Sequence, residues 1–352
     1  MPSASPDPGV DPAPARLVIH IGLQKTGTTF LQRALRDNRE DLAARGLHQL
    51  DPGAGLGIDG GAAHHFLAHA LLGRRLRHTP DAGFDRLEAH VAALRAALAE
   101  ASGTAVISSE DFSRFRRVHV ERLRALFPDP APDVAAGQPV RILVYLRRQD
   151  LWLDALYGQM QKVGNQQPLA DFIEQNRSRL DYKAFLAPWI RVFGPEALIL
   201  RVYEGFGAGG QAGGLWADFC TALDCPQAAS VLPRQAQANV SPPPEVSRYL
   251  AGIGDRQRRH RLRGLVERCL ERAPMREGLV WLSEAQAREI LSAEADRNRR
   301  IAKRHLGRKQ LFEDETITLQ PPLHTGWRAR LVVWRYLATG LGLRLADRLR
   351  GG

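Results

Sequence analysis

Short apolar runs alternate with amphipathic stretches over the first two thirds of the chain. Four runs have the length and apolar composition of buried strands: residues 16–22, 104–108, 140–146 and 197–202. Helical spacing of apolar positions marks three further segments: residues 28–45, 64–76 and 84–101. Buried strands that alternate with amphipathic helices are typical of a parallel sheet flanked by helices, so we expect the α/β class.

The outer parts of the chain follow other patterns. Residues 1–14 combine proline, aspartate, serine and alanine, which predicts a disordered leader. After about residue 211 the apolar runs stop, and the chain becomes arginine-rich and helical in its patterning. We therefore expect one α/β domain over residues 15–312, mostly helical in its later portion, and a basic amphipathic tail over residues 313–352. That tail either docks on the domain or lies on a membrane or a partner.

Composition narrows the class of protein. With 352 residues and 44% hydrophobic side chains, the chain is neither fibrous nor wholly disordered. Its cysteines are odd in number and form no CxxC pair, which excludes a disulfide framework and an ordinary zinc ribbon: Cys220, Cys225 and Cys269. The N-terminus lacks the apolar segment of a secretory signal, and no stretch is long enough to span a membrane. These features favour a cytoplasmic protein.

The net charge of +11 comes almost entirely from arginine. Such an excess fits either genome-wide composition bias or an acidic substrate or membrane surface, and we expect no nucleic-acid partner. Because lysine is scarce, a lysine within a glycine–threonine loop is informative.

That loop lies in the segment HIGLQKTGTTFL, residues 20–31, between the first expected strand and its helix. A strand, a tight turn and a helix N-terminus together direct backbone N–H groups at one point, which makes an anion site. Lys25 adds positive charge, and Gly27 allows close approach of the backbone. The hydroxyls that could donate to phosphate oxygens belong to Thr26, Thr28 and Thr29.

The spacing separates this loop from other phosphate-binding loops. The nucleoside-triphosphate loop requires GxxxxGK[ST], whereas Lys25 precedes Gly27 here, and no GxGxxG follows the strand. A kinase or a dinucleotide enzyme is therefore not favoured.

The string QKTGTTFL resembles the 5′-phosphosulfate loop of sulfotransferases that use 3′-phosphoadenosine-5′-phosphosulfate (PAPS), usually PKTGTTWL or PKSGTTWL. The resemblance implies a P-loop-type sheet and a loop that binds the 5′ end of PAPS. The residues expected in that role are Gln24, Lys25, Thr26, Gly27, Thr28 and Thr29, with Gln24 where proline is commoner.

A second resemblance concerns the 3′-phosphate of the same cofactor. The strand RILVYL leads into Arg147, which corresponds to the family's 3′-phosphate arginine. Eight residues later Ala155 stands where the family has serine, so one hydroxyl donor is lost. The wider string RRQDLWLDALYGQMQKVG is similar to bacterial carbohydrate sulfotransferases. Lys162 within it either lines the acceptor cleft or is a solvated helix lysine.

The C-terminal portion resembles the family less closely. Residues 298–312, NRRIAKRHLGRKQLF, are similar to a segment that closes bacterial members, although they equally fit a solvated basic helix. The RKGxxGDWK signature of the cytosolic enzymes is absent, which argues against close kinship with them.

Sulfuryl transfer to a hydroxyl requires a base, and the resemblance implies that Lys25 stabilises the leaving phosphate. Glu110, at the end of the expected strand 104–108, is the first choice of base, and a histidine, His65 or His64, is the second. Glu110 could instead be a helix-terminal carboxylate paired with Arg114. His65 and His69 have metal-ligand spacing, but without an evident acidic partner we expect no metal.

The resemblance thus implies a PAPS-dependent sulfotransferase that yields a sulfate ester and adenosine 3′,5′-bisphosphate. The acceptor would be a hydroxyl of a glycan, a glycolipid or another bacterial metabolite, possibly acidic. The alternatives are an NTP-dependent phosphotransferase and a non-catalytic nucleotide-binding relative of the fold.

Overall fold

The computed structural model describes residues 15–73, 86–127, 140–204, 206, 212–231, 242–270, 278–320 and 325–350. The expected disordered leader, residues 1–14, lies outside this part of the chain. The strands are β1 (Arg16–His20), β2 (Leu47–Gln49), β3 (Thr104–Ser108), β4 (Arg141–Leu146) and β5 (Leu198–Val202).

Helices make up most of the remaining described chain. Those of the first half are α1 (Thr28–Asp37), α2 (Arg39–Ala43), α3 (His65–Leu72), α4 (Leu87–Glu100), α5 (Arg117–Leu126), α6 (Gln149–Lys162) and α7 (Leu169–Asn176). Those of the second half are α8 (Tyr182–Phe193), α9 (Ala212–Ala222), α10 (Pro244–Ala251), α11 (Arg256–Leu270), α12 (Glu284–Ile301) and α13 (Gly326–Arg350). Short 3₁₀-helices are η2 (Glu110–Arg114), η3 (Arg177–Leu180) and η4 (Pro226–Ser230), and η5 (Ala302–Leu306) is a single wider turn of π-helix.

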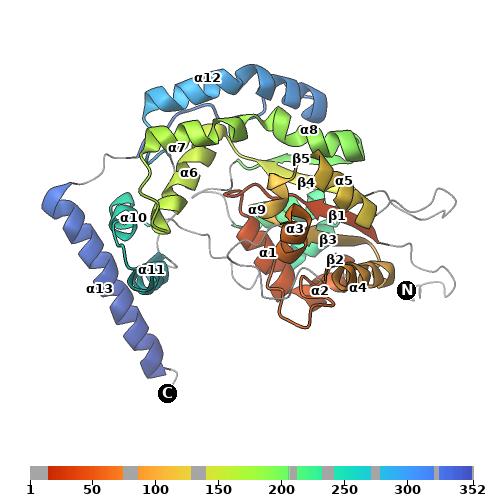
Figure 1. Ribbon diagram of the computed structural model, residues 1–352, viewed down its shortest axis with the longest axis horizontal. Coiled ribbons are helices and arrows are strands. Elements are labelled where there is room, and N and C mark those ends of the chain that lie inside the picture. The colour runs from red at the N-terminus through yellow and green to blue at the C-terminus, as the bar shows by residue number, and fades with distance from the viewer. Residues whose placement is uncertain are drawn as a thin grey trace, which may run out of the picture.

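The five strands form one parallel sheet in the order β2-β3-β1-β4-β5, which confirms the α/β class and the flanking helices (Figure 1). The register pairs His20 at the end of β1 with Ser108 of β3 and Leu143 of β4. The chain moves outward from β1 to β2, returns to β3, and then crosses β1 to reach β4. Ligands of open α/β sheets bind at the carboxyl ends of strands where the chain changes direction in this way.

Two layers of helices bury the sheet. Leu17 and Ile19 of β1 face the layer of α3, α4, α5 and α8, whereas Val18 faces α1 and α9. All three side chains are at most 2% exposed. Strands of a parallel sheet are buried on both faces, which explains why they appear in the sequence as continuous apolar runs.

The first helix is shorter than its pattern predicts. We expected one helix over residues 28–45, but α1 ends at Asp37 and α2 begins at Arg39. Asn38 separates them with a φ of −122°, and its side-chain amide donates to the carbonyl of Ala34 at 2.8 Å. Asparagine interrupts helices in this way because its side chain competes for backbone hydrogen bonds.

The C-terminal portion is helical, as expected. α12 packs with α6 and α7 around Trp152 and Leu282, and α10, α11 and α13 gather around a separate small core (Figure 1). The segment just beyond residue 312, where we expected the tail to begin, is tied to the sheet. The Glu204 carboxylate accepts the backbone N–H groups of Glu313 and Asp314 at 2.9 Å each. α13, which begins at Gly326, is the part of the tail that lies away from the sheet.

Candidate active site

The loop between β1 and α1 has an unusual backbone. Gly27, just before α1, has φ +76°, and a Cβ atom there would lie 2.4 Å from a methyl carbon of Leu215. Lys25 has φ +67°, a left-handed conformation that costs a residue other than glycine roughly 1–2 kcal/mol. Such strain is concentrated at binding and catalytic sites, where neighbouring groups hold the backbone in place.

Neighbouring side chains fix this loop. The indole N–H of buried Trp152 donates to the carbonyl of Gln24 at 2.9 Å, and the Arg147 guanidinium donates to the carbonyl of Lys25 at 2.9 Å. Within the loop, the Thr26 hydroxyl donates to the carbonyl of Leu23 at 2.6 Å. The Thr26 hydroxyl is therefore used to shape the loop, whereas Thr29 lies half-buried in the first turn of α1.

The sequence placed Lys25 and Arg147 in two separate motifs, and the structure brings them together at adjacent strand ends. Burial, with a smaller contribution from repulsion by Lys162 and Arg147, lowers the pKa of Lys25 to about 7 against an opposing attraction from Glu110. Burial also lowers the pKa of Lys162, to about 8. One region thus contains three cations: Lys25 of the β1–α1 loop, Arg147 just before α6, and Lys162 at the end of α6. Repulsion among them favours the binding of an anion.

Arg147 is held on several sides. Its guanidinium lies over the Tyr203 ring at 5.5 Å, and its carbonyl accepts the Tyr182 hydroxyl. Further along α6, Ala155 is half-buried. Its neighbour Asp154 accepts the backbone N–H groups of Val280, Trp281 and Leu282, so it anchors the loop before α12.

Glu110 follows β3 and lies against α1. Its two carboxylate oxygens accept the Thr28 hydroxyl at 2.9 Å and the Gln32 amide at 3.1 Å. Its expected alternative partner, Arg114, pairs instead with Asp111 at 3.0 Å. The Glu110 carboxylate is therefore held beside the β1–α1 loop rather than paired with an arginine of its own helical turn.

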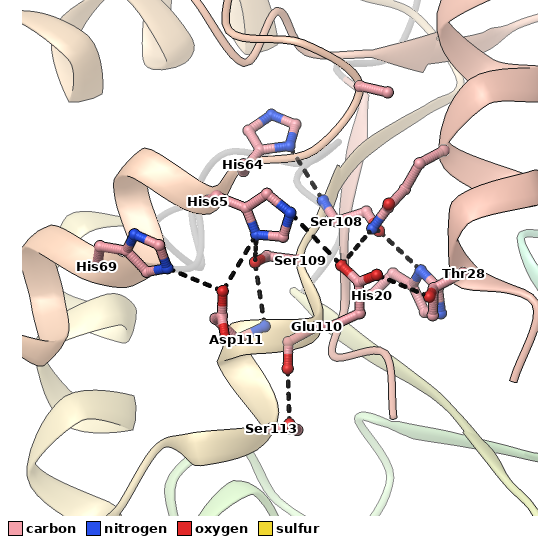
Figure 2. A network of polar contacts seen from close by, with 12 residues as sticks. His20, Thr28, His64, His65, His69, Ser108, Ser109, Glu110, Asp111 and Ser113 are labelled. Atoms are coloured by element: carbon pink, nitrogen blue, oxygen red, sulfur yellow. Dashed lines mark hydrogen bonds and ion pairs between the residues drawn. The ribbon is translucent and has the colours of Figure 1, made fainter. Parts of the chain in front are cut away.

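His65 joins Glu110 to a second carboxylate (Figure 2). One imidazole nitrogen lies 3.7 Å from the Glu110 carboxylate, and the other lies 3.3 Å from that of Asp111. Burial acts to lower the pKa of His65, but the hydrogen bond to Asp111 and the charges of Glu110 and Asp111 outweigh it and raise the pKa above its usual value. His69, on the same face of α3, also contacts Asp111, at 2.8 Å.

His65, His69 and Asp111 together are a candidate metal-binding group within the described residues. The expectation that no acidic ligand accompanies the histidine pair is therefore wrong, because β3 and η2 bring Asp111 to α3 from 42 residues away. The other Asp111 oxygen already pairs with Arg114. That guanidinium would oppose a metal cation, and mutual hydrogen bonds already satisfy the three groups.

Two further histidines are buried beneath this network. His64, the other candidate histidine base, accepts the Ser108 backbone N–H at 3.1 Å, and burial lowers its pKa to about 3. His20 contacts the Ser108 hydroxyl at 2.9 Å, and burial lowers its pKa to about 4. Both side chains are fully buried, so they support the ends of β1 and β3 as neutral imidazoles.

No family model and no curated protein matches this chain. Among solved structures, it is similar to a sulfotransferase from Alicyclobacillus acidocaldarius, with 14% sequence identity and a TM-score of 0.39. The match covers 67% of this chain and 89% of that protein. At this distance the likeness does not assign a reaction to the chain.

A depression of about 570 Å³ lies along β5. Arg201 of β5 and Glu204, which follows β5, line it together with Phe206 and Arg308. Arg201 pairs with Asp218 there. The positive charge of Arg201 is therefore already balanced by a carboxylate beside β5, and Arg201 is not part of the cationic region around Lys25.

Proposed function

We propose that this protein is a PAPS-dependent sulfotransferase that acts on a hydroxyl acceptor. The observation that carries the proposal is the direct contact between the two phosphate-binding motifs. The Arg147 guanidinium donates to the Lys25 carbonyl across 122 residues of sequence, and Glu110 lies against the same loop through Thr28. This arrangement suits a ligand that carries separate anionic groups. It also provides a base, Glu110, for the group that reacts with that ligand.

The residues present fit such a ligand. The left-handed backbone at Gly27 leaves no room for a side chain, and Lys25 has its pKa lowered by burial and by neighbouring cations. An added polyanion would relieve that repulsion. Lys25 and the Thr29 hydroxyl, with the backbone N–H groups at the start of α1 (those of Thr28 and Thr29), would hold the 5′ end of PAPS, and Arg147 would hold its 3′-phosphate. When bound, PAPS supplies a sulfuryl group on a phosphate leaving group.

The chain's own groups then have distinct roles. Glu110 accepts the proton of the acceptor hydroxyl as the acceptor oxygen bonds to sulfur. Lys25, in its protonated form, stabilises the negative charge that develops on the departing bridging oxygen. His65 places an imidazole nitrogen 3.7 Å from the Glu110 carboxylate and helps to hold that carboxylate in place.

The acceptor that we propose is a hydroxyl of a glycan, a glycolipid or a similar bacterial metabolite. The support is the resemblance of the α6 string to carbohydrate sulfotransferases and the position of Lys162 near Lys25, where it could meet an acidic acceptor.

The test is titration calorimetry of adenosine 3′,5′-bisphosphate, with ATP and magnesium measured in parallel. We expect micromolar or tighter binding of the bisphosphate, about −8 kcal/mol, and at least hundredfold weaker binding for Lys25→Ala and Arg147→Gln. Lys183→Ala, which removes an exposed lysine of α8, is the matched control and should bind as the wild type does.

Preferential binding of ATP would replace the proposal with a phosphotransferase. Unchanged affinity in Lys25→Ala would place the nucleotide elsewhere. Tight bisphosphate binding without transfer to any of a panel of sugar acceptors would favour the non-catalytic relative.

A further inference from the structure

α13 packs with one face on α10 and α11. Val333 is its buried residue in the small core that these helices share, together with Val246, Leu250 and Val266. Figure 1 shows α13 along one edge of the molecule, with α10 and α11 on its inner side. The outer face of α13 therefore lies away from the sheet and the candidate active site.

That outer face is apolar. Trp327 and Trp334 are 70% and 68% exposed, and Leu331 and Leu341 are 55% and 50% exposed. Spacings of four, three and seven residues place these side chains in one stripe along the helix. At 100° per residue, the stripe lies roughly opposite the face that packs in the small core, which is formed by Val332, Val333, Tyr336 and Leu337. An apolar stripe of this kind on a protein surface marks an interaction site.

Arginines border the stripe. On the same helical projection, Arg330 lies along one side, and Arg328 and Arg335 lie along the other. All three are exposed. The packed neighbour α11 adds more exposed arginines: Arg256, Arg258 and Arg261. Tryptophan and leucine between rows of cationic side chains are characteristic of helices that lie in the surface of a bilayer.

We propose that α13 binds the surface of an anionic lipid membrane, with Trp327 and Trp334 inserted at the level of the headgroups. None of the helices in the described part of the chain is long and apolar enough to cross a bilayer, so the helix would lie along the surface. The charge favours lipid over a second copy of this chain, because two such faces would bring their arginines together. This inference does not depend on the proposed reaction.

The experiment measures flotation of the full-length protein with vesicles. We expect it to float with vesicles of equal parts phosphatidylglycerol and phosphatidylcholine, and at least tenfold less with phosphatidylcholine alone. Trp327→Ala/Trp334→Ala and Arg328→Gln/Arg330→Gln/Arg335→Gln should each lower the partition coefficient at least tenfold. Higher salt should weaken binding of the wild type.

Fluorescence gives a direct readout of insertion. Of the six tryptophans, Trp152, Trp189 and Trp216 are fully buried, and Trp281 is half-buried. A blue shift on addition of anionic vesicles would therefore report on Trp327 and Trp334, and it should vanish in the double variant. Val118→Ser/Arg122→Gln, a similar exposed pair on α5, is the control and should bind as the wild type does.

Equal binding of the wild type and the tryptophan variant would overturn the proposal. So would equal flotation with anionic and neutral vesicles. A concentration-dependent dimer in sedimentation that Trp327→Ala/Trp334→Ala abolishes, without vesicle binding, would assign the stripe to self-association instead.

Discussion

On the β4 side of β1, side chains of one charge gather, whereas on the β3 side acids and bases pair with one another. The first side has Lys25, Arg147 and Lys162, and repulsion of Lys25 by the other two adds to burial in lowering the pKa of Lys25. The second side has Asp111 between two imidazoles, with Glu110 beside the first of them.

Under the proposed function, this difference would separate anion binding from proton transfer. A cluster of like charges is unfavourable without a ligand, so it indicates that a polyanion belongs there. A network of paired acids and bases is already satisfied, so its groups are oriented before any substrate arrives. Changes on the β4 side should therefore affect nucleotide affinity, and changes on the β3 side should affect turnover or stability.

The sharpest test of that separation is Glu110→Gln. We expect transfer to fall by about 10²–10⁴-fold, because an amide cannot accept the acceptor's proton. The affinity for adenosine 3′,5′-bisphosphate should stay within about twofold, since Gln retains a hydrogen-bond acceptor for Thr28. Steady-state kinetics and calorimetry on the same preparation would check both. Loss of nucleotide affinity equal to the loss of turnover would break the division between the two sides.

The next effect concerns the stability of the acid–base side. Asp111→Asn should lower the free energy of unfolding by about 2 kcal/mol, because both histidines and Arg114 lose a charged partner. The carboxyl pKa of Asp111 is held below its usual range, so this stabilisation is present above about pH 4 and is lost at lower pH. Because the pKa of His65 is raised, the stabilisation that comes from its pairing with Asp111 is strongest below about pH 6.5.

Urea unfolding at pH 3, 5 and 8 would measure this. The difference in the free energy of unfolding between Asp111→Asn and the wild type should be largest at pH 5. Asp224→Asn, which breaks an exposed pair with Arg16, is the control and should change stability by less than about 0.5 kcal/mol. Equal effects of the two variants would show that the histidine pairing contributes little.

The smallest expected effect is that of Lys162, at the margin of the cationic side. The free protein loses the Lys25 proton as pH rises through about 7, so wild-type affinity for the bisphosphate should fall above that pH. Lys162→Gln removes a repelling charge and should move this fall to higher pH. At pH 6, where both lysines carry charge, the variant should bind about three- to tenfold more weakly. Calorimetry from pH 6 to pH 9 would show this, and an unshifted profile would remove Lys162 from the site.

The sequence predicts the sheet well because its strands are local, continuous apolar runs. The bounds of β3 match the expected residues 104–108, and those of β4 and β5 begin one residue later than expected. β2 was not expected, because a three-residue strand has too few positions to show a period. The meeting of Lys25 and Arg147 follows from the parallel arrangement of the strands, which places both motifs at one edge.

The acid–base network could not be predicted from local patterns in the sequence. Asp111 meets His69 across 42 residues, and no local spacing records that contact. In the sequence His20 lies within the expected strand 16–22, and only its burial beside Ser108 shows that it is neutral. Gln32 has an ordinary helical position, yet it donates to Glu110. These relations arise from packing between elements.

The attachment of the late segment to the sheet has a consequence for how the protein is made. Buried Arg148, at the end of β4, pairs with Asp150 and donates to the carbonyl of Asp314, 166 residues further along the chain. Ribosomes add about 5–20 residues per second, so Arg148 waits roughly 10–30 s for that partner to be synthesised. Throughout that interval the nascent chain lacks one of the partners of an arginine that the finished protein buries. Completion of the contacts of Arg148 is therefore among the last events of biosynthesis.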